Sequence, residues 1–293
     1  MGAAPSPDTA LPLDVTRSTA ADPVLEARRL VVRRGARVTL DALDLRVPPG
    51  CVYALLGGNG AGKTTTLNAL LGFVPASSGQ ALVDGIDATR DPQAARARIA
   101  YLPENVALYP YLSGIENLQY FCTLSGLRID FGRACQLLAA SGLAEAAHSQ
   151  RVGGYSKGMR QKVGLAIARA RRARAMLLDE PTSGLDPAAA NEFARGVLDA
   201  RDAGLAILMA THDLFNALQV ADRIGILREG RLVAAFDAHG VAHEELERIY
   251  LEHARGGISE MHGTVGTVGT GQIGDGHSGH SGHSGSPFEE PLP

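Results

Sequence analysis

The feature that most constrains the fold of this chain is a glycine-rich octapeptide at positions 57–64, with the sequence GGNGAGKT. It follows a short apolar run, Cys51–Leu56, and precedes a predicted helix from about Gly62 to Gly72. Its spacing matches the phosphate loop, in which backbone N–H groups turn toward a β-phosphate, Lys63 reaches the β/γ oxygens and the Thr64 hydroxyl binds Mg²⁺. A chance glycine-rich turn before a helix is the alternative. The residues expected to contact a nucleotide here are Gly57, Asn59, Gly60, Ala61, Gly62, Lys63, Thr64 and Thr65.

Two adjacent carboxylates, Asp179 and Glu180, end another apolar run that we expect to lie beside this loop. Asp179 can hold Mg²⁺, directly or through water. Glu180 is then placed to act as the general base that polarises the attacking water. An isolated Asp-Glu pair usually belongs to a solvated turn, but the apolar residues before it and Pro181 after it favour a site.

His212 follows a predicted strand, Leu205–Ala210. An imidazole at a strand end can donate to a γ-phosphate oxygen, or order the water and the base. The alternative is a helix cap, because Thr211-His212-Asp213 precedes a helical segment. Together with the other motifs, the position favours phosphate sensing, and the predicted catalytic set is Glu180, His212 and Lys63.

Short apolar segments alternate with helical patterns along the chain, which favours an α/β fold with a mainly parallel sheet. The expected strands are Val24–Val32, Arg37–Val47, Cys51–Leu56, Gln80–Val83, Ile99–Leu102, Ala175–Leu178, Leu205–Ala210, Ile224–Leu227 and Arg231–Ala235. Further helices are expected at Pro187–Arg201, Leu214–Val220 and His243–His253. Between Ser113 and about Leu143 the apolar period is helical, which predicts a helical lobe inserted into the sheet domain.

Composition limits the remaining possibilities. The net charge of −3 gives no global basic field, so we expect no nucleic-acid partner. The three cysteines have no metal-ligand spacing and indicate reduced thiols in the cytosol. No apolar run approaches the ~18 residues that cross a bilayer. We therefore expect a cytoplasmic protein that reaches the inner face of the cell membrane only through a partner.

The domain organisation follows from the same patterns. We expect a disordered leader (1–22), one nucleotide-binding domain (23–236) whose helical lobe covers about 105–172, a C-terminal helix (237–255) and a disordered tail (256–293). The tail contains a repeat that places three histidines three residues apart, at His277, His280 and His283. They can bind a metal ion on a flexible chain, but the composition also fits a solvated tail.

Taken together, these motifs resemble those of the nucleotide-binding subunit of an ABC transporter. The resemblance rests on the phosphate loop, on Tyr155-Ser-Lys-Gly-Met, on the segment from Leu177 to Asp186 and on Thr211-His212, and it covers about Val24 to Ala235. It implies a P-loop NTPase of the ABC ATPase fold, with a parallel core, an antiparallel β subdomain and a helical lobe, that uses ATP and Mg²⁺. It also implies a head-to-tail homodimer acting on a separate transmembrane permease.

The resemblance assigns further residues. Ser156 and Gly158 would contact the γ-phosphate held by the other subunit, and Asp186 would lie in the loop that links the two ATP sites. The usual Leu-Ser-Gly-Gly-Gln signature is here Tyr155-Ser-Lys-Gly-Met, a form that resembles exporters with a separate permease. Glu104 stands where most of the family has a glutamine that touches Mg²⁺, which a carboxylate can also bind.

Arg34 stands where relatives usually have an aromatic residue that stacks on adenine. A guanidinium plane can also stack on a base, so two interpretations stay open: Arg34 either stacks on adenine or is a solvated surface arginine.

The segment Leu102–Leu118 resembles the ATPase subunit of the copper-maturation transporter that serves nitrous oxide reductase. It also resembles multidrug and antibiotic exporters, which is the alternative assignment. In the family this region docks the permease, so Tyr109, Tyr111 and Leu112 are candidate contacts or else core residues of the lobe.

The remaining rivals are a soluble ABC ATPase of translation or DNA repair and a metal-binding scaffold. The single cassette argues against the first, and an intact Glu180 argues against the second.

Overall fold

The computed structural model describes residues 22–254, and residues 1–21 and 255–293 lie outside the described part. The expected leader, apart from residue 22, and the expected tail with its three histidines fall outside it. Within residues 22–254 no helix combines the length and the apolar character that a membrane span requires.

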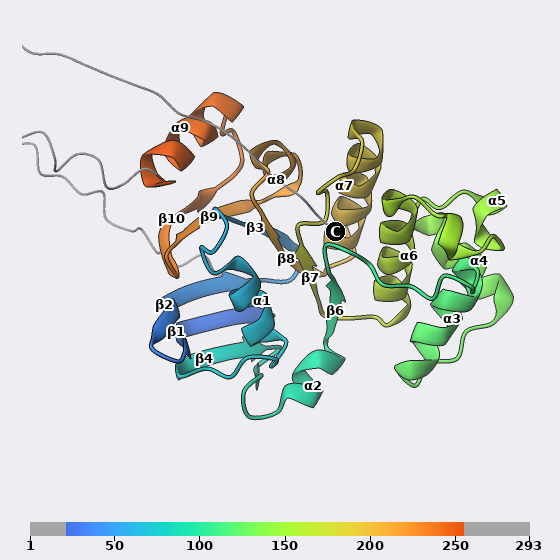
Figure 1. Ribbon diagram of the computed structural model, residues 1–293, viewed down its shortest axis with the longest axis horizontal. Coiled ribbons are helices and arrows are strands. Elements are labelled where there is room, and N and C mark those ends of the chain that lie inside the picture. Colours follow the sequence, from blue (N-terminus) through green and yellow to red (C-terminus); the bar gives the residue numbers. More distant parts are fainter. Residues whose placement is uncertain (1–21, 255–293) are drawn as a thin grey trace, which may run out of the picture. The chain divides into compact units, whose positions relative to one another are not determined.

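A six-stranded sheet contains the parallel strand pairs (Figure 1). Its order is β10-β9-β3-β8-β7-β6, and every pair is parallel except β9 with β10. Its strands are β3 (Cys51–Leu56), β6 (Ile99–Leu102), β7 (Ala175–Asp179), β8 (Ala206–Thr211), β9 (Arg223–Arg228) and β10 (Arg231–Asp237). The mainly parallel sheet is confirmed. β8 pairs with both β3 and β7, so the strand that ends at Asp179 is one strand removed from the strand that leads into the glycine-rich loop.

A second sheet of four strands is entirely antiparallel, with the order β2-β1-β4-β5. Its strands are β1 (Leu25–Arg34), β2 (Arg37–Val47), β4 (Ser78–Val83) and β5 (Ile86–Asp87), of which β5 is not predicted from the sequence. Buried and exposed residues alternate along the second half of β2, because one face packs on the core and the other meets solvent. This sheet is the antiparallel subdomain that the family resemblance implies.

Helices begin and end where the local sequence supplies caps. They are α1 (Lys63–Leu70), α2 (Pro92–Ala97), α3 (Gly114–Leu124), α4 (Phe131–Ala140), α5 (Glu145–His148), α6 (Lys157–Ala170), α7 (Pro187–Asp202), α8 (Leu214–Val220) and α9 (His243–Ala254). In α3, the Ser113 side chain accepts from the Glu116 N–H while the Glu116 carboxylate accepts from the Ser113 N–H. The periodicity did not predict α2, which starts at an Asp91 cap followed by proline.

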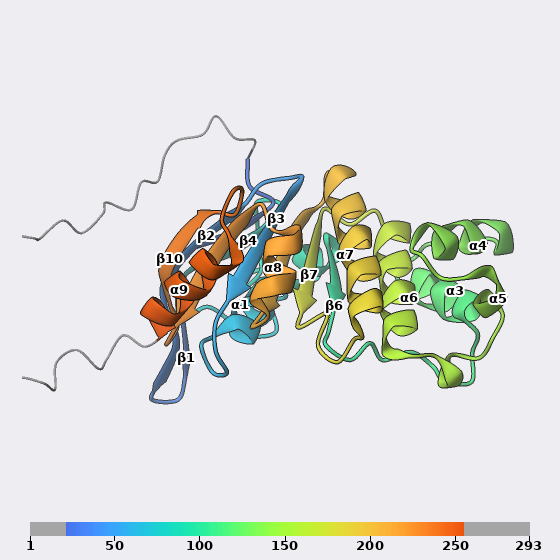
Figure 2. The same ribbon diagram turned by 90° about the horizontal axis from the view of Figure 1, so that it is seen from above.

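Helices α3 to α6 come between β6 and β7 in the chain and form an inserted lobe with its own apolar core. In Figures 1 and 2, α3, α4 and α5 gather beyond α6 and α7, away from the four-stranded sheet. Leu118 and Leu138 are fully buried in this core. The hydroxyl of buried Tyr155 donates to the Ala147 carbonyl at 2.5 Å. This bond holds the chain just before α6, where the Ser-Lys-Gly-Met segment begins.

Candidate functional site

The glycine-rich loop connects β3 to α1, and its course requires glycine at particular positions. Gly62 has a φ of +113°, a conformation that residues with a side chain rarely adopt. A Cβ atom at Gly57 would lie 2.5 Å from the Leu227 carbonyl oxygen. Lys63, the first residue of α1, is only 6% exposed, and its ammonium donates to the Gly57 carbonyl at 2.6 Å. The loop therefore presents backbone N–H groups and one buried cation to the same space.

This space is a pocket of about 390 Å³. It is lined by Arg37, Thr39, Gly58, Asn59, Gly60, Ala61, Gly62, Lys63, Thr64, Thr65, Glu104, Asp179 and Glu180. The structure thus brings three acidic residues that are remote in sequence to the glycine-rich loop.

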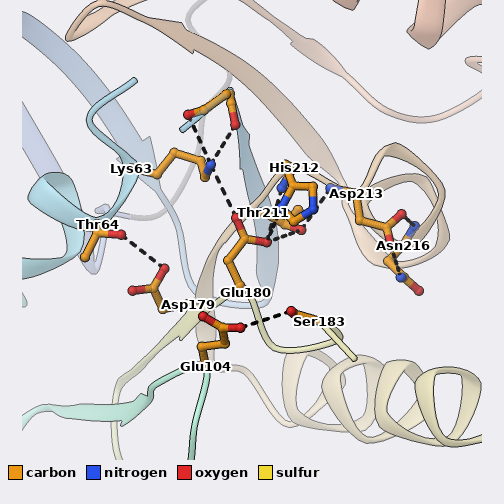
Figure 3. Close-up of polar contacts among 12 residues, drawn as sticks. Lys63, Thr64, Glu104, Asp179, Glu180, Ser183, Thr211, His212, Asp213 and Asn216 are labelled. Atoms are coloured by element: carbon orange, nitrogen blue, oxygen red, sulfur yellow. Dashed lines mark hydrogen bonds and ion pairs between the residues drawn. The ribbon is translucent and has the colours of Figure 1, made fainter. Parts of the chain in front are cut away.

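Thr64 and Asp179 face each other in this pocket (Figure 3). The Thr64 hydroxyl donates to Asp179 Oδ1 at 3.4 Å. Burial raises the pKa of the Asp179 carboxyl, the Thr64 hydrogen bond partly offsets this, and the charge of Glu180 adds to the rise. A bound cation would relieve this crowding of carboxylates. Mg²⁺ is usually held by one or two carboxylates together with phosphates and waters, so these residues fit the expected metal.

Glu180 makes polar contacts to α1, to β8 and to the loop that follows β8 (Figure 3). Its Oε1 lies 3.3 Å from the Lys63 ammonium, while its Oε2 accepts from the Thr211 hydroxyl at 3.1 Å and lies 2.9 Å from His212 Nδ1. Burial alone raises the pKa of Glu180, but the hydrogen bond from His212 and the charge of Lys63 outweigh it, so the pKa is lowered overall. At neutral pH Glu180 is therefore ionised, the state in which a carboxylate can accept a proton from water.

The backbone turns sharply at Glu180, whose φ is +44°. Its N–H donates to the Ala210 carbonyl at 2.8 Å, which joins the end of β7 to the end of β8. A left-handed conformation is uncommon for a residue with a side chain and occurs preferentially at functional sites. The conformation directs the carboxylate toward the residues that follow β8.

The end of β8 contributes two residues, of which the sequence predicted one. His212 is 61% exposed, and its backbone N–H also donates to Glu180 Oε2, at 3.3 Å. Asp213, not His212, caps α8 by accepting from the Asn216 N–H. Thr211 is buried against Glu180 and was missed. A hydroxyl residue at the last position of an apolar strand, directly before a candidate site histidine, is the signal that identifies it.

Two positions that depart from the family pattern contact each other. The Lys157 ammonium lies 3.7 Å from Glu104 Oε1, and the Ser183 hydroxyl donates to the same oxygen at 3.0 Å. The side-chain amide of buried Gln161 donates to the backbone carbonyls of Glu104 and Pro181, at 3.4 and 3.3 Å. The loop after β6, the start of α6 and the loop after β7 are therefore joined at Glu104.

The attraction between the Lys157 ammonium and the Glu104 carboxylate can be measured through the free energy of unfolding. Lys157→Glu places a carboxylate beside Glu104, so we expect the free energy of unfolding in urea to fall by about 0.2–1 kcal/mol, the range for exposed pairs. Adding Glu104→Lys restores the attraction and should recover most of the loss, less so in high salt. The single variant Glu104→Lys completes the comparison. If the changes in unfolding free energy of Lys157→Glu and Glu104→Lys sum to the change in the double variant, Lys157 and Glu104 do not form a pair.

Ser156, Gly158 and Asp186 do not line the pocket of the described chain. Ser156 caps α6 by accepting from the Met159 N–H at 3.2 Å, and Asp186 caps α7 by accepting from the Ala189 N–H at 2.9 Å. A Cβ atom at Gly158 would lie 3.2 Å from the Ala189 Cβ, so glycine permits the close approach of α6 and α7. Within one chain these residues shape the helix ends.

Arg34 is also absent from the described residues that line this pocket, whereas Arg37 lines it. The two arginines are opposite each other at the exposed turn between β1 and β2. Thr39, two residues further along β2, lines the pocket as well. No sequence motif marks Arg37 or Thr39, so their place in the pocket is not predicted from the sequence.

The sheet, the glycine-rich loop and the carboxylates at the end of β7 define a P-loop ATPase. The ABC transporter family model matches residues 40–183. The sequence is 34% identical to YdbJ of Bacillus subtilis, an uncharacterized ABC transporter ATP-binding protein. The alignment spans 221 residues and covers 75% of this chain and 71% of the relative. Over 204 residues, 69% of this chain and 64% of the relative, it is 39% identical to the daunorubicin resistance ATP-binding protein DrrA3 of Streptomyces coeruleorubidus.

A solved structure supports the same relationship. It is an ATP binding subunit of an ABC transporter that aligns with a TM-score of 0.67 at 29% identity, covering 78% of this chain and 99% of that chain. This chain belongs to the ATP-binding subunits of the ABC transporter family, and it is an ATPase.

Proposed function

We propose that ATP is bound with its phosphates on the glycine-rich loop and Lys63, and that Glu180 takes the proton of the attacking water. The meeting of Lys63, Asp179 and Glu180 in one pocket is the observation that carries this assignment. Thr64, Asp179 and Glu104 would hold Mg²⁺, which when bound neutralises charge on the phosphates. His212 holds the Glu180 carboxylate through Nδ1. A doubly protonated ring would in addition donate from Nε2 to a γ-phosphate oxygen.

We propose further that two copies pair head to tail, so that each completes the other's ATP site with Ser156 and Gly158. The absence of these residues from their own chain's pocket, as far as the described residues line it, supports this pairing. Ser156 caps α6, and the N-terminus of a helix favours an anion. A second pocket of about 480 Å³ is lined by Glu180, His212 and residues 182–185. It lies where Asp186 would link the two sites.

The chain would energise a separate transmembrane permease at the inner face of the membrane. Tyr111 supports this proposal, because it is 82% exposed and follows by two residues Tyr109, which forms an aromatic group with Tyr120 and Phe121. The Tyr109 and Tyr120 rings lie 4.7 Å apart, and their hydroxyls are 3.1 Å apart. Leu112 is half-buried against the lobe. A fixed aromatic base with one projecting ring suits the docking of a permease helix.

For the cargo we propose a drug-like small molecule that is exported, since a daunorubicin resistance protein is among the relatives. Copper delivery for nitrous oxide reductase is the second candidate. It rests only on the resemblance of Leu102–Leu118, and neither relative described above has that role in its name.

Deleting the gene in cells that carry this chain separates the two candidates. We expect higher cellular accumulation of daunorubicin, measured by its fluorescence, with nitrous oxide reduction unchanged. The wild-type gene should restore export, as should Tyr111→Phe, whereas Tyr111→Asp should not, because a charge disrupts an apolar contact. Unchanged accumulation together with lost nitrous oxide reduction would instead support copper maturation.

A further inference from the structure

None of the described residues that line the phosphate pocket is aromatic. A nucleotide base bound by a protein usually rests on an aromatic ring or on a guanidinium plane. Arg34, the expected stacking residue, does not line this pocket, so the base contact must be sought where the pocket continues.

A neighbouring pocket of about 300 Å³ lies against the same loop. It shares Arg37 and residues 58–61 with the phosphate pocket. Its other walls include Ile226 and Leu227 at the end of β9, Glu229 in the following turn, and Tyr250 of α9. Tyr250 is the one aromatic residue in the described lining of the two pockets, and it is half-buried.

Hydrogen bonds join the segments that line this neighbouring pocket. The Gly230 N–H donates to the Ala61 carbonyl at 2.8 Å, which joins the turn after β9 to the glycine-rich loop. The Arg228 guanidinium donates to the His253 carbonyl at 2.6 Å, which joins the end of β9 to the end of α9. Leu246 is fully buried and anchors α9 on the core. Tyr250 is therefore held at a fixed place beside the loop.

We infer that this neighbouring pocket of about 300 Å³ binds the purine base of the nucleotide, with the Tyr250 ring and the Arg37 guanidinium as its planar partners. Glu229 supplies a polar group for the base edge, while Ile226 and Leu227, both buried in the core, form part of the pocket wall. The C-terminal helix thus replaces the aromatic residue that position 34 lacks. The inference rests on the proposed binding of the phosphates at the glycine-rich loop.

The test compares ATP with inorganic tripolyphosphate, which has no base, by calorimetric titration without Mg²⁺ so that no ATP is consumed. Tyr250→Ala should raise the dissociation constant for ATP about tenfold or more, the usual effect of losing one stacking partner. It should leave tripolyphosphate binding unchanged. Tyr250→Phe should bind ATP as the wild type does, and Arg34→Ala should change neither ligand.

Three results would overturn the inference. One is an unchanged affinity of Tyr250→Ala for ATP, and another is a weakening of ATP binding by Arg34→Ala alone. The third is an equal loss of ATP and tripolyphosphate binding in Tyr250→Ala, which would mean that the loop itself was disturbed. If wild-type protein bound neither ligand, the proposed phosphate site would fail as well, and this outcome is distinct from the other three.

Discussion

Replacing Glu180 with glutamine is expected to lower ATP turnover by about 10²–10⁴-fold, the usual contribution of a general base. The amide keeps the shape of the side chain but cannot take a proton from water. In the native protein His212 and Lys63 keep the carboxylate ionised, with contacts of 2.9 and 3.3 Å. Because the substitution also removes a negative charge near the phosphates, we expect ATP binding to persist.

Phosphate release at saturating ATP and Mg²⁺ measures this loss, and calorimetric titration checks ATP binding. Glu192→Gln is the matched control. Glu192 pairs with Lys162 on the surface of α7, outside the pocket, so the turnover of this variant should equal that of the wild type. If Glu180→Gln and Glu192→Gln release phosphate at the same rate, another group is the base.

The second large effect is expected for Ser156→Asp, which should abolish turnover while each chain still binds ATP. Aspartate caps a helix as well as serine does, so α6 should remain intact. In the proposed pair, its charge would face the γ-phosphate of the other subunit. Two unit charges 4 Å apart repel by about 4 kcal/mol at an effective dielectric of 20, roughly a thousandfold in the association constant of the pair.

Ser156→Asn separates charge from capping, because asparagine caps equally well and is neutral. We expect it to keep more turnover than Ser156→Asp, with equal thermal stability by circular dichroism. A Ser156→Asp protein with wild-type turnover would show that Ser156 does not face a phosphate.

The sequence predicts what local chemistry determines. Cys51–Leu56 is the same strand in the prediction and in the structure, because six apolar residues end at a glycine. The placement of Asp179 and Glu180 at a strand end follows from the apolar run before them. A pattern of this kind records which residues are buried, so the elements and their ends are readable.

Contacts between remote segments are not readable in this way. The insertion of β8 between β3 and β7 depends on the order of strands in the sheet, which no local pattern records. The pairing of Lys157 with Glu104 depends on how the lobe packs against the sheet. The place of Arg37 in the pocket, with Arg34 outside it, depends on the exposed turn between β1 and β2.

We expect Ser156 of a second copy to complete each ATP site, and sedimentation velocity measures the pairing that this requires. Glu180→Gln protein should sediment as a monomer alone and as a dimer with ATP and Mg²⁺, because bound ATP is not consumed. The double variant Glu180→Gln/Ser156→Asp should bind ATP and stay monomeric. A double variant that still dimerises with ATP, or a Glu180→Gln protein that stays monomeric with ATP bound, would contradict the shared site.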